Sequence, residues 1–221
     1  MSKPVIAIDG PSASGKSTVA RRVARATGGI YVDSGALYRA MTWAALQQGV
    51  DVHDAAAVIA CKDRCDWQFD VVEHAVHFTI DGVDPGEEIR GEAVRESVSF
   101  VARIPEIRGF IVEQLQAMTR FGALVMEGRD IGSVVFPDTP HKYYLDADPE
   151  ERARRRNEEI KQLEGTSEID TVLSSLEKRD KMDSSRKTAP LQVAEGAQVV
   201  NTTHMSIDEV VADIVARASA A

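Results

Sequence analysis

A glycine-rich segment close to the N-terminus has the residue types and the spacing that phosphate binding requires. It follows the pattern G-x-x-x-x-G-K-[ST] and consists of Gly10, Pro11, Ser12, Ala13, Ser14, Gly15, Lys16, Ser17 and the adjacent Thr18. In such a loop, backbone N–H groups surround phosphate oxygens, the lysine adds a positive charge near the β- and γ-phosphates, and the serine hydroxyl can bind Mg²⁺. The segment therefore predicts a site for a nucleoside triphosphate.

Arginines at four further places could bind a second phosphate. They are Arg39, Arg129 beside Asp130, the run at 152–156, and the mixed-charge segment at 177–186. Arginine is suited to stabilising the charge on a phosphoryl group during transfer. The first three places also have simpler interpretations, as a surface side chain, a salt bridge and a solvated helix face, respectively. In the run at 152–156, however, four arginines close together in an acidic protein favour a clamp over polyphosphate.

The elements that must position these residues alternate between strands and helices. Short apolar runs and amphipathic stretches predict parallel strands and helices, respectively. The strands are expected at 4–9, 30–33, 124–127, 142–146 and 198–201, and the main helices at 18–25, 36–48 and 206–218. This order predicts an α/β fold, a three-layer sandwich with a central parallel sheet of about five strands. Ligands of such sheets bind at the carboxyl ends of the strands, where the segments near 10, 33 and 129 all fall.

The stretch from 66 to 90 interrupts this alternation. Residues 67–71 and 76–80 predict a hairpin, which we expect to be a small antiparallel insertion outside the main sheet. Two helices are expected after it, near 91–103 and 105–121. Cys61 and Cys65 lack further ligands at a metal-site spacing, so we expect two buried free thiols.

Composition limits the class of protein. A chain of 221 residues with 43% hydrophobic and 28% charged residues is typical of one globular domain, here 1–221. The net charge of −9 argues against nucleic acid or an acidic membrane as partner. No apolar run could span a bilayer, and the N-terminus leads directly into the first expected strand, which leaves no signal peptide. We expect a cytoplasmic protein, and a monomer.

Several further blocks, in this order, resemble the bacterial cytidylate kinases, a family of nucleoside monophosphate kinases. They are Ile-Asp-Gly-Pro-Ser at 8–12, Asp-Ser-Gly-Ala-Leu-Tyr-Arg at 33–39, Gly-Glu-Glu-Ile-Arg at 86–90, Glu-Gly-Arg-Asp-Ile-Gly at 127–132, Val-Val-Phe-Pro-Asp at 134–138 and Arg-Lys-Thr-Ala-Pro-Leu at 186–191. The resemblance covers nearly the whole chain. It implies transfer of the γ-phosphate of ATP, with Mg²⁺, to CMP or dCMP. It also implies a monophosphate-binding insertion at about 61–110 and a short lid at about 150–167.

The resemblance also assigns roles to single residues. Contacts to the acceptor, chiefly to its phosphate, are implied for Ser34, Arg39, Arg129 and Arg186. Cytosine recognition is implied for Ser99, Arg108 and Asp130. Arg179 and Asp183 are expected at the ribose end and acceptor side, Arg155 in the lid over ATP, and Ser17 on the metal. The catalytic set is therefore Lys16, Arg129, Arg155, Arg179 and Asp183.

Two positions depart from related patterns. Many monophosphate kinases have Gly-Thr where this chain has Ser17-Thr18, so either hydroxyl could meet Mg²⁺. The strand expected at 124–127 ends in Glu127 instead of the usual aspartate, which leaves an acidic metal ligand open.

Three other functions compete with the kinase hypothesis. A P-loop GTPase needs an N-K-x-D motif, and neither Asn157 nor Asn201 begins one. A kinase for a small metabolite such as shikimate is compatible with the loop alone, although the many arginines and the long insertion favour a nucleotide acceptor. A catalytically silent binding module is disfavoured because Lys16, Ser17 and the arginines are all retained.

Overall fold

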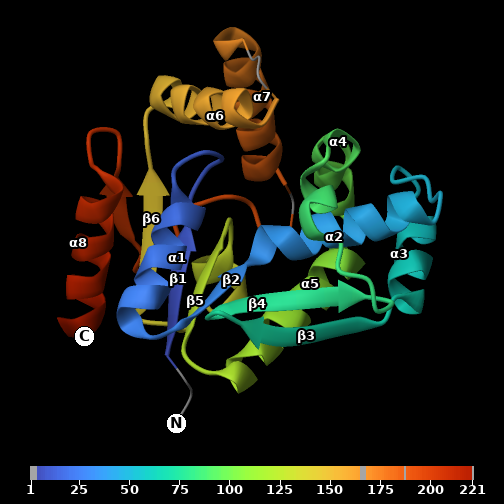
Figure 1. Ribbon diagram of the computed structural model, residues 1–221, viewed down its shortest axis with the longest axis horizontal. Coiled ribbons are helices and arrows are strands. Elements are labelled where there is room, and N and C mark those ends of the chain that lie inside the picture. Colours follow the sequence, from blue (N-terminus) through green and yellow to red (C-terminus); the bar gives the residue numbers. More distant parts are fainter. Residues whose placement is uncertain (1–3, 165–167, 187, 221) are drawn as a thin grey trace.

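The computed structural model describes residues 4–164, 168–186 and 188–220. A twisted sheet lies at its centre, helices cover both faces, and a pair of helices lies above the carboxyl ends of the central strands (Figure 1). The α/β three-layer fold that the sequence predicts is therefore confirmed.

The sheet has seven strands in the order β3-β4-β2-β5-β1-β6-β7. Five of them, β1, β2, β5, β6 and β7, pair in parallel, as predicted. Central β1 aligns Asp9 with Gly128 of β5 and with Tyr144 of β6. The strands are β1 (Val5–Asp9), β2 (Ile30–Asp33), β3 (Trp67–Val72), β4 (Ala75–Ile80), β5 (Leu124–Gly128), β6 (His141–Asp146) and β7 (Gln198–Asn201).

The hairpin formed by β3 and β4 belongs to this sheet, so the expectation that it lies outside is wrong. The Tyr31 amide donates to the His74 carbonyl, and Tyr31 pairs with Ala75 in parallel register. Because β2 would otherwise expose unpaired backbone groups, the hairpin extends the sheet at that edge. The tight turn between the two strands is made by Glu73 and His74, both with positive φ.

Helices on the two faces bury alternate residues of the central strands. Val5 and Ala7 of β1 pack into a large core with α2, α4 and α5, whereas Ile6 and Ile8 pack with α1 and α8. This alternation is what a sheet covered on both faces requires. The helices are α1 (Lys16–Thr27), α2 (Ser34–Gln47), α3 (Ala55–Arg64), α4 (Glu92–Val101), α5 (Pro105–Ala117), α6 (Pro149–Glu164), α7 (Ile169–Ser184) and α8 (Ile207–Ala220), with short turns η1 (Gly86–Arg90), η2 (Met118–Phe121) and a π-helical turn η3 (Ile131–Val135).

Local signals at helix ends were accurate. Ser206 and Glu209 form the expected reciprocal cap of α8, with N···O distances of 2.7 and 3.3 Å. Gly49 has the left-handed φ of 67° expected after α2. That helix begins at Ser34 instead of residue 36, because the Asp33 carboxylate accepts from the Ala36 amide and caps it.

Two further expectations concern the cysteines and the lid. Both thiols are free, but only Cys61 is fully buried, and Cys65 is partly exposed at the end of α3. The expected lid at 150–167 coincides with α6, apart from residues 165–167, which lie outside the described residues. No helix in the described ranges is long and apolar enough to cross a membrane.

Candidate functional site

The glycine-rich loop lies between the end of β1 and the start of α1, and it contains backbone with positive φ and a close approach to β6. Ala13 and Gly15 have φ of 60° and 89°. A Cβ atom on Gly10 would lie 2.1 Å from the carbonyl oxygen of Leu145 in β6. Since no side chain fits that space, Gly10 lets the loop approach the neighbouring strand.

Lys16, the first residue of α1, is buried and folded back onto its own loop. Its Nζ donates to the Pro11 carbonyl at 2.6 Å and lies 3.5 Å from the Ser14 hydroxyl. Burial, helped by the positive charge of Arg129, lowers the pKa of Lys16 to about 7. The ammonium is therefore poorly solvated and would gain from a negatively charged ligand.

Glu127 is the penultimate residue of β5 and lies beside this loop. Its carboxylate accepts from the Tyr31 hydroxyl at 3.0 Å. Burial, with the nearby charge of Asp33, raises the pKa of Glu127, while Lys16 and the Ser17 hydroxyl oppose that rise. Ser17 and Thr18 are both exposed at the start of α1. A hydroxyl and a carboxylate thus meet at the P-loop, a set of oxygen atoms suited to Mg²⁺ when phosphates supply the other ligands. Within the described residues, no cluster of three or more His, Cys, Asp or Glu side chains could hold a metal by itself.

Ser34 and Gly128 pack against each other at the carboxyl ends of β2 and β5. The Ser34 hydroxyl donates to the Glu127 carbonyl at 2.7 Å, and a Cβ on Gly128 would lie 2.5 Å from that hydroxyl. The close approach explains why β5 ends in glycine.

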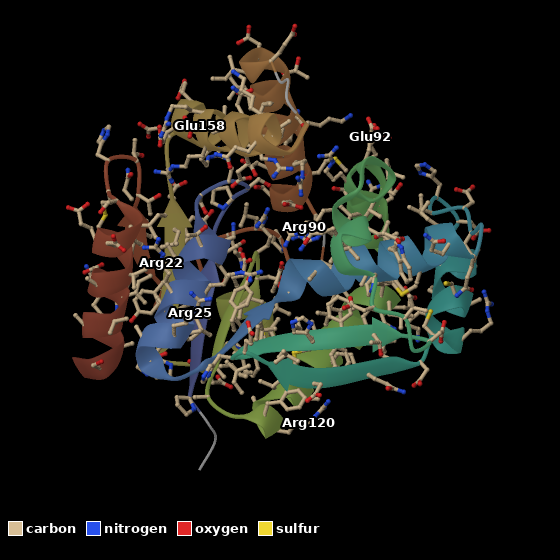
Figure 2. The ribbon with its side chains drawn as sticks, viewed as in Figure 1. Arg22, Arg25, Arg90, Glu92, Arg120 and Glu158 are labelled. Atoms are coloured by element: carbon tan, nitrogen blue, oxygen red, sulfur yellow. The ribbon has the colours of Figure 1, made fainter. Side chains whose placement is uncertain are left out.

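Arg39 lies on the first turns of α2 and pairs with Asp33 at 2.8 Å. Arg90, labelled in Figure 2, reaches the same carboxylate from η1 at 4.0 Å. Although burial acts in the opposite direction, the Arg39 guanidinium holds the pKa of Asp33 below its ordinary value. The Nε of Arg39 is buried without a hydrogen-bond partner in the described part of the chain, so one donor remains available.

Arg108 of α5 and Asp130 after β5 form a buried ion pair, with side chains only 4% and 6% exposed. Arg108 also donates to the Ala102 carbonyl at 3.2 Å, and its guanidinium lies 5.3 Å from the centre of the Tyr38 ring. Ser99, predicted to act with these residues, is partly buried on α4, and no hydrogen bond within the described residues joins it to Arg108 or Asp130.

Arg129 joins the glycine-rich loop to α7. It donates to the Ser12 hydroxyl at 2.8 Å and pairs with Asp183 at 3.1 Å. Asp183 also lies 3.6 Å from Arg186, whose Nε is buried without a partner among the described residues. Arg179 lies in the same group, and burial together with Arg129 lowers its pKa to about 10. The predicted residues 129, 179, 183 and 186 are thus brought together next to the loop.

The arginine run on α6 divides between two environments. Arg154 and Arg156 pair with glutamates of their own helix, and Glu158, one of these partners, is more than half exposed (Figure 2). Arg155 also pairs with Glu151 of the same helix at 2.8 Å, but its Nη atoms turn inward. Nη2 donates to the Thr202 carbonyl at 2.7 Å, and Nη1 would lie 3.8 Å from a Cβ on Gly15. Only the inward-facing part of this run belongs to the site.

Sequence reasoning gave Asp9 no role, and it placed Arg152 and Asp180 in two separate candidate segments without pairing them. Asp9, at the end of β1, accepts from the amides of Ile131 and Gly132 at 2.9 and 2.7 Å. Arg152 and Asp180 form a buried pair against the loop at Ser12. A buried acid directly before Gly10 was a usable signal for Asp9, because an apolar strand rarely ends in an unpaired carboxylate. Nothing in the sequence paired Arg152 with Asp180.

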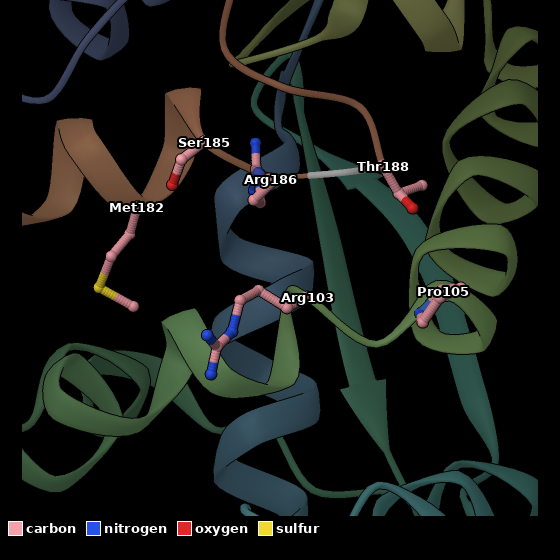
Figure 3. Close-up of a pocket in the computed structure, with 6 residues that line it drawn as sticks. All are labelled: Arg103, Pro105, Met182, Ser185, Arg186 and Thr188. Carbon is pink, nitrogen blue, oxygen red and sulfur yellow. The ribbon is translucent and has the colours of Figure 1, made fainter.

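An open pocket of about 400 Å³ adjoins Arg186, between the end of α7 and the turn from α4 to α5 (Figure 3). Its lining combines cationic, hydroxyl and apolar side chains, from Arg103, Pro105, Met182, Ser185, Arg186 and Thr188. The pocket gives access from solvent to the region where Arg186 lies.

A glycine-rich loop between β1 and α1 of a mostly parallel sheet, with a buried lysine and an arginine cluster beside it, defines the class of P-loop α/β proteins. Within this class, the chain belongs to the cytidylate kinase family, whose model matches residues 6–220. A protein named cytidylate kinase from Geobacillus kaustophilus is 43% identical over 206 residues, covering 93% of this chain and 92% of its own length. Similar relatives with the same name come from Pelotomaculum thermopropionicum, 43% identical over 98% of this chain and 96% of that protein, and Mycobacterium leprae, 42% identical over 97% and 95%.

Proposed function

We propose that the protein transfers the γ-phosphate of ATP to CMP or dCMP, with Mg²⁺, giving ADP and CDP or dCDP. The observation that carries this proposal is the position of Arg129, which donates to Ser12 of the P-loop and pairs with Asp183 of the predicted acceptor group. Its guanidinium therefore lies between the loop that would hold the donor and the residues that would hold the acceptor. Membership of the cytidylate kinase family supports the choice of acceptor.

The P-loop would hold the ATP phosphates. Its backbone N–H groups and the start of α1 supply partial positive charge, and the buried Lys16 ammonium supplies a full one. Ser17 would bind Mg²⁺, with the Glu127 carboxylate close by. The ion would neutralise charge across the β- and γ-phosphates.

The acceptor phosphate would bind among Arg39, Arg129, Arg186 and Ser34. Two of these arginines keep a buried Nε–H without a hydrogen-bond partner in the described residues. A buried donor left unpaired costs about 1–3 kcal/mol, so an anionic ligand at this place would satisfy a need that the protein leaves open. Arg179 would add further positive charge on the same side.

The ion pair of Arg108 and Asp130 would distinguish cytosine from uracil. Cytosine carries an exocyclic amine that can donate to a carboxylate, whereas uracil has a carbonyl oxygen there. Since both charged side chains are buried, a base that leaves one of them unpaired would bind less well. Ser99 would contribute from α4.

The reaction requires no nucleophilic side chain, because the acceptor phosphate itself attacks the γ-phosphorus of ATP. The new P–O bond forms as the bond to the ADP oxygen breaks. Lys16, Arg129, Arg155 and Arg179 would supply the positive charges that bridge donor and acceptor, and Asp183 would hold Arg129 in place. Catalysis would then come from positioning and charge neutralisation.

A direct assay tests this proposal. The protein is mixed with ATP and Mg²⁺, and ADP production is followed with CMP, dCMP, UMP, AMP and shikimate in turn. CMP and dCMP are expected to give the highest rates. Faster turnover of UMP or AMP would refute the recognition of cytosine, and turnover of shikimate alone would point to a metabolite kinase. The cytoplasmic location and monomeric state expected from the sequence stay predictions.

A further inference from the structure

Ser12 occupies a junction that its place in the P-loop does not by itself explain. All three of its polar groups contact charged side chains from other elements. Its amide donates to Asp180 at 3.2 Å, its carbonyl accepts from Arg152 at 3.1 Å, and its hydroxyl accepts from Arg129 at 2.8 Å. Ser12 itself is buried, with 5% of its surface exposed.

The backbone of Ser12 is fixed by the two helices above the sheet. Arg152 of α6 pairs with Asp180 of α7, and it also donates to the Ala147 carbonyl at 3.0 Å. One carboxylate oxygen of Asp180 meets Arg152 and the other meets the Ser12 amide. The pair therefore anchors both backbone groups of Ser12 and fixes the point from which its side chain extends.

The hydroxyl of Ser12 meets Arg129 from the other side. Arg129 uses Nη2 for Ser12 and Nε for Asp183. Asp183 and Asp180 are one turn apart on α7, so the same helix face holds both ends of this chain of contacts. Two fixed partners restrict a flexible guanidinium better than one does, because each constrains a different nitrogen atom.

We propose that Ser12 is a positioning residue: its backbone is held by Arg152 and Asp180, and its hydroxyl orients Arg129 toward the phosphoryl group. This rests on the proposed function, in which Arg129 bridges donor and acceptor. It assigns the side chain of Ser12 a role distinct from the backbone cradle for ATP.

Replacing Ser12 by alanine removes the hydroxyl and retains the backbone groups that Arg152 and Asp180 hold. A hydrogen bond to a charged group is lost, so kcat is expected to fall by about tenfold. The dissociation constant for ATP is expected to change by less than about twofold, since the backbone N–H groups of the cradle remain.

A double-mutant cycle tests whether the effect passes through Arg129. Single-turnover rates with CMP are measured for wild type, Ser12→Ala, Arg129→Ala and the double variant, and ATP binding is measured by calorimetry. In the Arg129→Ala background, Ser12→Ala is expected to have almost no further effect. Thr139→Val is the matched control, since it removes a hydroxyl that donates to Val5 at the opposite end of β1. It is expected to retain wild-type rates.

The outcomes separate the two proposals. If the wild-type protein does not phosphorylate CMP, both fail. If it does, and Ser12→Ala lowers the rate by the same factor with and without Arg129, the positioning role is refuted while the proposed function stands. Weaker ATP binding that accounts for the whole loss would also refute it, since the hydroxyl would then belong to the ATP cradle. If Ser12→Ala unfolds at a much lower temperature than the control, Ser12→Cys, which fills similar space with a weaker acceptor, replaces it in the cycle.

Discussion

Replacing Asp130 by alanine should lower kcat/KM for CMP much more than it lowers kcat/KM for UMP. The carboxylate lies in a buried pair with Arg108, which has further contacts with the Ala102 carbonyl and the Tyr38 ring. Alanine removes the acceptor that cytosine would use and leaves the Arg108 guanidinium without its counter-charge. Both consequences have a magnitude that can be estimated from this geometry.

The effect on selectivity follows from one hydrogen bond to a charged group. Such a bond contributes about 1.5–3 kcal/mol, so the ratio of kcat/KM for CMP to that for UMP should fall by about 10- to 150-fold. Stability should fall as well, since breaking a buried ion pair on one side costs about 3–5 kcal/mol.

The two effects are separated by a second variant and a control. In Arg108→Met/Asp130→Leu both charges are replaced by apolar side chains of similar size, so stability should largely recover while selectivity stays low. Asp213→Ala breaks an exposed pair with Arg217 on α8 and should change the free energy of unfolding by less than about 1 kcal/mol. The assay compares kcat/KM for both nucleotides with urea unfolding of each variant. Equal losses for CMP and UMP in Asp130→Ala would refute base recognition by this carboxylate.

Three further predictions concern the P-loop and its neighbour Asp9. Burial raises the pKa of Asp9 to about 6, so the wild-type free energy of unfolding should fall by up to about 3 kcal/mol as pH rises from about 4 to about 6. Urea unfolding of Asp9→Asn at several pH values should lack this slope, and parallel curves for the two proteins would contradict the assignment to Asp9. Gly10→Ala places a Cβ 2.1 Å from the Leu145 carbonyl, so it should destabilise the protein by about 1–3 kcal/mol and abolish ATP binding. The control Gly109→Ala, whose Cβ would lie in open space, should do neither. Retained ATP affinity in Gly10→Ala would show that the loop adapts. The pKa of Lys16 is about 7, so at a pH one unit higher Lys16 should take up most of one proton when ATP binds. Calorimetry in two buffers of different ionisation enthalpy measures this uptake, and the same uptake in Lys16→Met would assign the proton to another group.

Features encoded by neighbouring residues were predictable from the sequence. The P-loop, the five parallel strands and the cap of α8 each depend on a pattern of a few consecutive residues, and each lies where it was expected. The carboxyl ends of parallel strands share one edge of a sheet, so the approach of Arg129 to the P-loop was predictable too.

Features that depend on contacts between distant segments were not. The hairpin joins the sheet through Tyr31 and Ala75, a pairing that no local pattern specifies. Asp180 meets Ser12 across 168 residues, and Asp9 meets Ile131 across 122. The first two amides of the π-helical turn at 131–135 donate to the same Asp9 carboxylate, a contact with a distant segment that its own residues do not indicate.

Competition between acceptors tests the central claim most directly. Wild-type protein is given ATP labelled at the γ-phosphate, Mg²⁺, and equal concentrations of CMP, UMP and AMP, and the labelled products are separated by chromatography. The account predicts that the label appears predominantly in CDP, and that Arg129→Ala slows its transfer strongly while leaving a measurable rate. Label that appears mainly in UDP or in a second ADP pool, or transfer to CMP that persists unchanged without Arg129, would contradict it.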